Sequence, residues 1–285
     1  MFSLPALAVY TVFWIFPVFL GFYISFTNWN LLKPTWEYVG FKNWNWLFTS
    51  TVGKRYMFNT LKVTGIYTVC HIAMVLIFGM LLALLYKKLT KPYSVMRAII
   101  FMPRYIAMST CGVIFLWMLN ADYGIINVTL RKMGLQGVPW LEDRRMAMVS
   151  VLVLTGWHGV GYGMMIYLSA MLGISRDYFE AAELDGASGV QTFRYITLPL
   201  LSPTTLFLLI TTFISSMKVF QSVDVLTGGG PYNSTEVFVY YIYRLAFRDF
   251  RIDRASVNAL LFFVILLVVT ASTIRITNKN VHYDA

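Results

Sequence analysis

Long apolar segments alternate with shorter polar segments along this chain. A helix rises about 1.5 Å per residue, so crossing roughly 30 Å of hydrocarbon takes about 20 residues. Segments of this length and character lie at 2–26, 59–86, 94–119, 146–170, 203–223 and 256–274. The pattern therefore predicts an all-α integral membrane protein in which six transmembrane helices form a single domain over residues 1–285.

The composition agrees with lipid as the main solvent of the protein. Of 285 residues, 58% are hydrophobic and 13% are charged, and the mean hydropathy is +0.64. Such values lie outside the range of soluble domains. The first segment is too long for a signal-peptide core and lacks a basic leader, so we expect it to be a retained span. In this context the net charge of +10 does not indicate a nucleic-acid partner.

Motifs for catalysis or metal binding are absent from the sequence. Cys70 and Cys111 both fall in apolar segments, which predicts neither a disulfide framework nor a zinc site. The sequence contains no phosphate-binding G-x4-G-K-[ST] loop, no H-E-x-x-H and no G-x-S-x-G. We therefore expect no catalytic residue, no metal and no cofactor in this chain.

The most polar stretch, residues 171–202, separates the fourth and fifth apolar segments. Asp177 with Glu180 resembles a capping pair that begins one short helix, and Ser188 with Gln191 forms an S-x-x-Q capping box that begins a second. Gly186 lies between them and can adopt the left-handed conformation that ends a helix. The stretch therefore predicts a helix–turn–helix.

Two prolines follow this second short helix. Pro199 and Pro203 cannot donate a backbone hydrogen bond, so we expect them to end the helix before the next span.

The same stretch carries a recognisable pattern, E-A-A-x3-G-x9-I-x-L-P. Its residues are Glu180, Ala181, Ala182, Gly186, Ile196, Leu198 and Pro199, and the longer string E-A-A-E-L-D-G-A-S adds Asp185 and Ala187. The pattern resembles the signature of permease subunits of type I binding-protein-dependent ABC importers. The longer string resembles the carbohydrate branch, whose members import maltose-type sugars and glycerol phosphate. The stretches ISFTNWN, NADYGIIN and LTGGGP agree with this resemblance.

The resemblance implies a function and a set of partners. The helix–turn–helix would contain the coupling helix, which docks in a cleft of a cytoplasmic ATPase. A second permease, two ATPase subunits that bind ATP and Mg, and an extracytoplasmic solute-binding protein would complete the assembly. The chain would be a multi-pass protein of the cytoplasmic (inner) membrane of a bacterium, working by alternating access. It would be a transport subunit and not an enzyme.

Orientation cannot be read from the positive charges. With both chain ends inside, more Lys and Arg fall on the outer loops than on the inner ones, against the usual bias. We therefore take the orientation from the resemblance, which places residues 171–202 and the C-terminal Arg275 and Lys279 in the cytoplasm.

Polar residues inside the spans predict a substrate path. Ionisable groups at membrane depth are costly and usually face a partner or a water-filled path. His71, Arg104, His158 and Lys218 are such groups, and the predicted spans contain no Asp or Glu. The candidate path residues are Arg104, Tyr105, His158, Thr212, Ser215, Ser216 and Lys218. Histidines, serines and threonines in such spans are more often hydrogen-bonded residues of the helix packing.

The unbalanced positive charge favours an anionic substrate. A guanidinium such as Arg104 can hold a carboxylate through two parallel hydrogen bonds, so we expect an acidic oligosaccharide such as an alginate or another uronate fragment. A phosphorylated polyol is the next candidate. A neutral oligosaccharide also remains open, because a second permease could supply the missing carboxylates.

Two other kinds of function compete with ATP-driven import. An ion-gradient-driven secondary transporter should carry buried acidic residues, which the predicted spans lack. An intramembrane enzyme would need a nucleophile and base at depth, for which His71 and His158 are the candidates.

Overall fold

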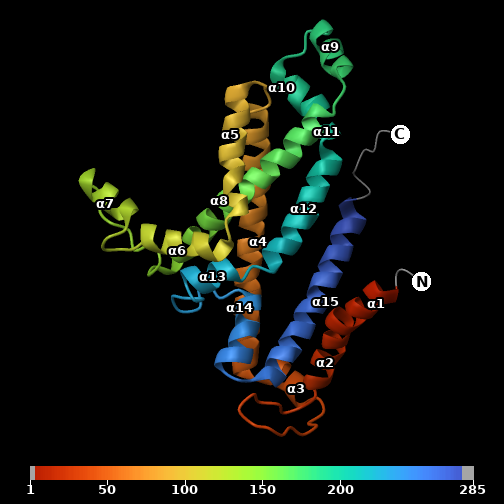
Figure 1. Ribbon diagram of the computed structural model, residues 1–285, viewed down its shortest axis with the longest axis vertical. Helices are drawn as coiled ribbons and strands as arrows, with labels where there is room; N and C mark the ends of the chain where they lie inside the picture. The colour runs from red at the N-terminus through yellow and green to blue at the C-terminus, as the bar shows by residue number, and fades with distance from the viewer. Residues whose placement is uncertain (1–3, 278–285) are drawn as a thin grey trace. The chain divides into compact units, whose positions relative to one another are not determined.

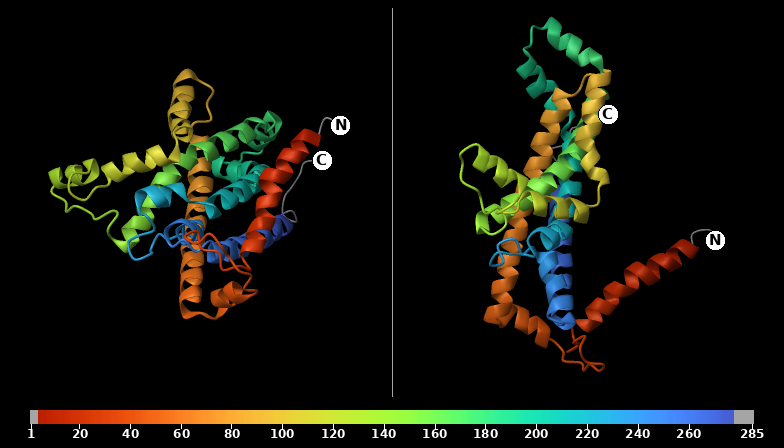
Figure 2. Two further views of the ribbon diagram at one scale, coloured as in Figure 1. Left: turned by 60° about the horizontal axis from the view of Figure 1, so that its bottom comes forward. Right: turned by 60° about the vertical axis from the view of Figure 1, so that its left-hand side comes forward.

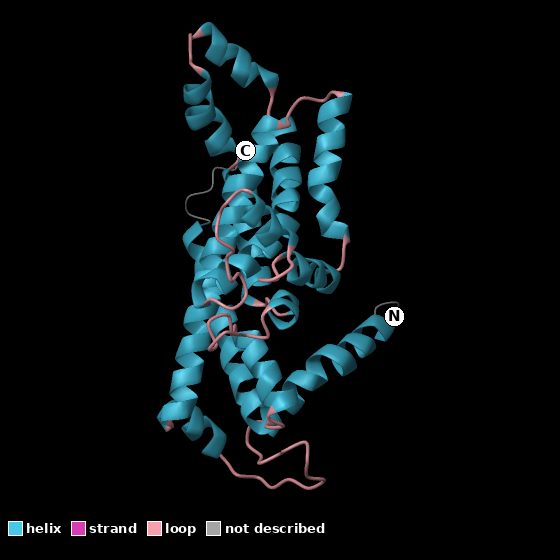
Figure 3. Ribbon diagram, turned by 90° about the vertical axis from the view of Figure 1, so that its left-hand side faces the viewer, coloured by secondary structure: helices cyan, strands magenta, loops and turns pink. Residues whose placement is uncertain are grey.

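The computed structural model describes residues 4–277, and within that range the chain is helical, without strands (Figure 3). Thr27 and Tyr38 form an isolated β-bridge. The chain divides into two compact units. One contains residues up to 64 together with 236–268, and the other contains 65–235 together with the residues from 269 onward.

The first unit contains the N-terminal helices and the segments around α14. Its elements are α1 (Leu4–Tyr10), the π-helix η1 (Thr11–Ile15), α2 (Phe16–Ile24), α3 (Lys42–Thr49), the beginning of α4 (Thr51–Leu85), α14 (Phe238–Tyr243), the π-helix η4 (Arg244–Arg248) and most of α15 (Ile252–Thr277). Tyr241, Leu245, Ala246 and Ala255 form a buried apolar cluster here, and Tyr56 packs against it.

The second unit contains the remainder of α4 and the helices of the central sequence (Figure 1). Its further elements are α5 (Lys91–Phe101), the 3-10 helix η2 (Met102–Tyr105), α6 (Met108–Met118), α7 (Ile125–Lys132), α8 (Arg144–Leu172), α9 (Arg176–Leu184), α10 (Gly189–Thr192), the π-helix η3 (Phe193–Thr197), α11 (Leu198–Leu200), α12 (Ser202–Met217) and α13 (Gln221–Leu226).

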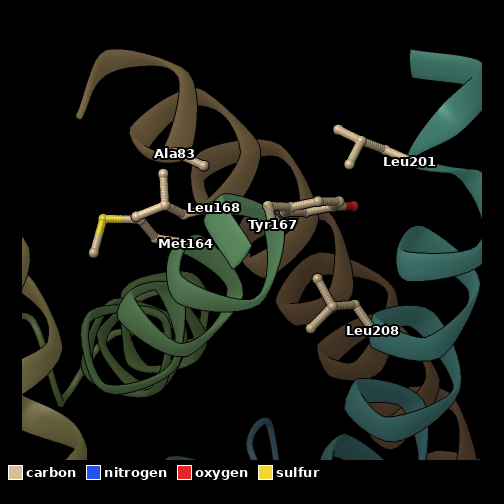
Figure 4. Close-up of a cluster of buried hydrophobic side chains, with 6 residues drawn as sticks. All are labelled: Ala83, Met164, Tyr167, Leu168, Leu201 and Leu208. Carbon is tan, nitrogen blue, oxygen red and sulfur yellow. The ribbon is translucent and has the colours of Figure 1, made fainter. Parts of the chain in front are cut away.

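The core of the second unit lies where α4, α8 and the start of α12 meet (Figure 4). Its buried members are Ala83, Met164, Tyr167, Leu168, Leu201 and Leu208. Tyr167 is fully buried, and its hydroxyl donates to Thr205 Oγ1 at 3.1 Å. The ring therefore contributes apolar contact while its polar atom remains hydrogen-bonded.

Glycines along α8 allow other helices to approach its backbone. A Cβ on Gly163 would lie 2.7 Å from the Val75 carbonyl oxygen of α4, and one on Gly161 would lie 2.4 Å from the Ile100 carbonyl oxygen of α5. Gly79 of α4 is equally close, because its Cβ would lie 2.9 Å from the Gly163 carbonyl carbon. These contacts between backbones require glycine, as is common where membrane helices cross closely.

The prediction of an all-α membrane protein is confirmed. Among the described residues four helices are long and apolar enough to cross a membrane, and two bent pairs bring the number to as many as six. The first is Leu4–Ile24, which corresponds to the predicted span 2–26. Residues 2 and 3 lie outside the described range, as does Lys279, which was predicted to be cytoplasmic. The span predicted at 59–86 begins earlier, at Thr51, while 146–170 and 256–274 correspond to α8 and α15.

The span predicted over 94–119 is bent rather than one continuous helix. Helix α5 and η2 make an angle of 100° with α6, and the chain between them is extended at Ile106 and Ala107, with ψ of 134° at both. Pro103 coincides with the change from α-helix to 3-10 helix at Met102, because it cannot donate the hydrogen bond that would continue the α-helix, and the break follows three residues later.

The span predicted at 203–223 also ends earlier than expected. Helix α12 stops at Met217, and α13 begins as a separate short helix at Gln221. At the other end of α12, the helical stretch Gly189–Leu200 meets it at an angle of 62°. No glycine or proline marks the break after Met217, so packing rather than local sequence sets it.

The close approach of α4 and α8 gives a test of the fold. Gly79→Ala would place a methyl group against the Gly163 backbone, so we expect a loss of about 1–3 kcal/mol of stability from overpacking and a lower melting temperature of the purified protein. Gly65→Ala on the same helix meets nothing within 4 Å and should melt like the wild type or higher. Equal melting temperatures for the two variants would contradict this packing.

Candidate functional site

A cavity of about 500 Å³ lies within the second unit, and its wall combines apolar surface with polar and charged side chains. Six elements contribute to its wall: α4, η2, the start of α6, α8, the end of α12 and the start of α13. The lining residues are Tyr67, His71, Arg104, Met108, Thr155, His158, Gly159, Ser215, Lys218, Val219, Phe220, Gln221 and Ser222. The breaks in two predicted spans, at residues 106–107 and 218–220, therefore both border this cavity.

Two permanent cations face the cavity. Arg104 lies on η2, immediately before the break, and its guanidinium carbon is 5.3 Å from the centre of the Tyr162 ring on α8. Lys218 caps the C-terminal end of α12, where the helix dipole favours a positive charge. None of the residues that line the cavity carries a carboxylate. The cavity therefore has a positive potential that favours negatively charged groups.

His71 holds three helices together at the cavity wall. His71 Nδ1 and Ser216 Oγ on α12 form a hydrogen bond of 2.7 Å, whose donor depends on the tautomer of the ring. The other ring nitrogen lies 3.4 Å from the Thr155 carbonyl of α8. The ring stacks on Tyr67, with centroids 5.5 Å apart. His71 therefore has the packing role that the sequence left open.

His158 stabilises the break between η2 and α6. Its Nε2 donates to the Ile106 carbonyl at 3.2 Å, which lies in extended chain and lacks a helical partner. Gly159 follows it on α8, and a Cβ there would lie 3.3 Å from His71 Nε2. Residues 158 and 159 of α8 therefore contact both the break at residues 106–107 and the His71 ring.

The structure brings together only some of the candidate path residues. Arg104, His158, Ser215 and Lys218 line the large cavity, while Thr212 lines a smaller one of about 130 Å³ that shares Arg104 and Ser215 with it. Ser216 is buried and hydrogen-bonded to His71 of α4 and to the Thr212 carbonyl of its own helix. Tyr105 is 80% exposed and lines neither cavity. Although Tyr105 follows Arg104 directly in sequence, it does not line the cavities that Arg104 lines.

Sequence reasoning missed several residues of the cavity. Tyr67 and Thr155 lie in apolar spans and resemble packing residues, so no sequence signal distinguishes them. Gln221 and Ser222 were assigned to the end of the fifth span, whereas they begin α13. Pro103 was the available signal for the break that places Arg104 and Met108 at the cavity.

The stretch 171–202 forms the predicted pair of helices, here called the knuckle (residues 175–200). Figure 1 and the right-hand view of Figure 2 show α9 and α10 at one end of the second unit, away from α6 and α13. The capping box of α10 is present in full, because Ser188 Oγ accepts from Gln191 and the Gln191 side chain accepts from Ser188. The expected Asp177 cap was wrong: Ser175 caps α9 by accepting from the Asp177 amide at 3.3 Å.

Gly186 ends α9 in the predicted left-handed conformation, with φ of 70°. Its amide donates to the Glu183 carbonyl, and the Ala187 amide donates to the Ala182 carbonyl. This pair of hydrogen bonds is the Schellman motif. It fixes the angle between α9 and α10.

Several side chains of the knuckle are exposed, and two of the most exposed ones are apolar. Glu180, Ala181, Asp185 and Gly186 are exposed, whereas Ala182 is buried. Leu184 is 89% exposed and Val190 is 76% exposed, on either side of the turn. Such apolar side chains on a polar projection are typical of an interaction surface.

Pro199 does not end the second helix of the knuckle. The helix continues from Gly189 to Leu200 through a π-helical turn at Phe193–Thr197, in which the Leu198 amide donates to the Phe193 carbonyl. The wider turn accommodates the proline. Ile196 lies in this turn half-buried, and Leu198 and Pro199 follow it with exposed side chains.

Within the described residues, the chain combines apolar helices long enough to cross a membrane, a cavity at two broken helices and a projecting knuckle. The model of the binding-protein-dependent transport system inner membrane component family matches residues 75–278, and the chain belongs to this family. It is a permease of the ABC importer class, carbohydrate type, and a multi-pass inner-membrane protein.

Individual relatives extend over nearly the whole chain. The sn-glycerol-3-phosphate transport system permease protein UgpA of Agrobacterium fabrum is 29% identical, over 98% of this chain and 94% of its own length. The probable ABC transporter permease protein YurN of Bacillus subtilis is 32% identical, over 95% and 92%. A crystal structure of a bacterial ABC transporter involved in the import of the acidic polysaccharide alginate aligns with TM-score 0.83 and 25% identity, over 98% and 94%.

These matches decide among the functional alternatives. The resemblance to ABC importer permeases is confirmed, and the chain is a transport subunit rather than an enzyme. Dependence on a binding protein is a property of the family. The ion-gradient-driven transporter and the intramembrane enzyme are therefore set aside.

The positive potential of the cavity gives a direct chemical test. Ser215 lines it and is exposed there, so Ser215→Cys in a background with Cys70→Ala and Cys111→Ala should react faster with an anionic methanethiosulfonate than with a cationic one. We expect a rate ratio of about tenfold, because a charged cleft concentrates counter-ions. The ratio should fall when Arg104→Gln is added. A ratio near one in the parent would contradict a cationic cavity.

Proposed function

We propose that this permease carries an acidic oligosaccharide, such as a uronate oligomer, across the cytoplasmic membrane of a bacterium by alternating access. The cavity bordered by Arg104, His158, Ser215 and Lys218 would be the part of the translocation path that this chain supplies. A solute-binding protein would deliver the substrate. Thr212, Tyr105 and Ser216 were also predicted to contact substrate, and of these we retain only Thr212, on the wall of the adjoining smaller cavity.

The observation that carries this proposal is the charge of the cavity wall. Arg104 and Lys218 face the cavity, and no carboxylate lines it to balance them. A guanidinium held near apolar surroundings without a counter-charge is costly. An anionic substrate would supply that counter-charge, and its carboxylate would match the planar donors of Arg104.

The names of the relatives support a negatively charged substrate. One is a permease for glycerol phosphate, and the structural neighbour is a transporter of the acidic polysaccharide alginate. Both substrates carry an anionic oxygen group on a polyhydroxylated carbon chain. A phosphorylated polyol is therefore the second candidate, because a phosphate would meet the same cations.

The knuckle would couple this chain to ATP hydrolysis. A second permease and two ATPase subunits would complete the assembly, and the ATPases would bind ATP and Mg. Leu184 and Val190 would enter an apolar cleft of the ATPase, with Glu180 and Asp185 beside basic groups of that partner. The Schellman motif at Gly186 and the capping box at Ser188 make the knuckle stiff enough to transmit movement to α12.

Substrate charge is tested by ATP hydrolysis in the complete transporter. We expect an alginate tetrasaccharide to stimulate hydrolysis in wild type and much less in Arg104→Gln, which keeps the side chain polar but removes its charge. Loss of a charged hydrogen bond corresponds to about 1.5–3 kcal/mol, or roughly tenfold or more in the half-maximal concentration. Stimulation by maltotetraose alone, unchanged in Arg104→Gln, would exclude an acidic substrate.

Coupling is tested at the turn of the knuckle. Gly186→Val places a β-branched residue at φ of 70°, at a cost on the order of 1 kcal/mol or more. The spans should still fold, but less ATPase should co-purify and transport should be lost. Gly189→Ala, three residues away with open space around it, is the matched control and should behave as wild type. Normal substrate-stimulated ATP hydrolysis in Gly186→Val would argue against the coupling role.

A further inference from the structure

The start of α6 lies at the cavity with backbone donors that the helix itself does not use. The first backbone hydrogen bond of α6 runs from the Cys111 amide to the Ala107 carbonyl, at 3.0 Å. The amides of Met108, Ser109 and Thr110 precede it, and no side chain caps this end. Met108 lines the cavity. A helix start carries a partial positive charge and donors suited to an anion.

A second, independent feature at the same cavity is an unused hydroxyl. Ser222 lines the cavity and is only 1% exposed, and among the described residues its Oγ has no hydrogen-bond partner. A buried hydroxyl without a partner costs free energy. A substrate group that accepts a hydrogen bond there would remove that cost.

Helix packing brings these two features together. A Cβ on Gly112 would lie 2.9 Å from Val225 Cγ1, so α6 and α13 are in close contact at these residues. Ser222 precedes Val225 on α13, and Met108 precedes Gly112 on α6. Both preceding residues reach the cavity that Arg104 also lines. The break at Ile106, held by His158, is what points the start of α6 in this direction.

We propose that the amino end of α6 and Ser222 bind the anionic oxygen group of the substrate, a carboxylate or a phosphate, next to Arg104. This inference rests on the proposed anionic substrate and adds its binding position. The Met108–Thr110 amides and the Ser222 hydroxyl donate to the oxygens, while Arg104 and Lys218 balance the charge. Neutral sugar hydroxyls gain much less from these donors, because hydrogen bonds to ionised acceptors are roughly twice as strong.

One amide can be removed without rebuilding the helix. Met108 occupies the first helical position, where proline is favoured, and Ala107 before it already has φ of −57° and ψ of 134°, as a residue before proline requires. Met108→Pro therefore deletes an N–H in place. Met108→Ala is the matched control, since it shortens the side chain but keeps the amide. Ser222→Ala independently deletes the hydroxyl.

The experiment is equilibrium binding to the complete transporter in nanodiscs. The probes are radiolabelled alginate tetrasaccharide, sn-glycerol 3-phosphate and maltotetraose. We expect the dissociation constant of the anionic probe that binds wild type to rise about tenfold in Met108→Pro relative to Met108→Ala, and severalfold or more in Ser222→Ala. Any binding of maltotetraose should change little. Which anionic probe responds identifies carboxylate or phosphate as the group bound.

Two outcomes would contradict the proposed anion site, and a third would leave the decision to Ser222→Ala. If an anionic probe binds wild type and both variants equally well, the α6 site is excluded while the proposed function stands. If neither anionic probe binds wild type, the proposed function fails and the inference fails with it. If Met108→Pro does not assemble, as judged by co-elution of the subunits, the smaller change Ser222→Ala decides the matter.

Discussion

The second unit depends on the close approach of backbones at the glycines of α8. Without side chains at Gly161 and Gly163, the carbonyls of Ile100 and Val75 come within the space that a Cβ would occupy. This contact seats the end of α5 on α8, so that the chain turning at Ile106 lies beside His158. Gly159 similarly admits the His71 ring. The cavity is a consequence of this packing, because a bulkier α8 would hold these elements apart.

Arginines of the first unit account for part of the excess of positive charge on the predicted outer loops. Arg244 pairs with the buried Glu236 at 2.9 Å and lies over the Tyr56 ring at 4.8 Å, while Arg254 lies over Trp46 at 4.1 Å. Arg251 pairs with Asp253 at 2.7 Å. Burial raises the pKa of Glu236, and Arg244 partly offsets that effect. These cations are engaged by the fold itself, so their number in a long segment says little about the side of the membrane.

Stiffness in the knuckle arises from local hydrogen bonds, which makes it independent of the packing around the cavity. Ser175 and the Ser188–Gln191 box cap the two helix starts, and Gly186 closes the end of α9. The π-turn before Pro199 then carries the helix onward to Leu200, next to the start of α12. The hydrogen bonds that shape the two helix starts and the turn therefore all lie within residues 175–200.

The sequence by itself determined the features that depend on neighbouring residues or on length. Six apolar stretches predict the spans because lipid thickness sets their length, and Ser188, Gln191 and Gly186 predict the knuckle because caps and left-handed turns are local. The single cation Arg104 in an apolar span predicted a polar surrounding, since charge in lipid is costly.

Only the tertiary structure decided which polar groups share a cavity. The break after Met217 has no glycine or proline, Tyr67 and Thr155 are indistinguishable from packing residues in sequence, and Ser216 is bound to His71 rather than facing the cavity. The span over 94–119 is divided because Pro103 weakens the helix and His158, distant in sequence, holds the open turn. Spacing along one helix cannot specify such contacts, because they depend on how helices cross, and glycines on α8 set those crossings.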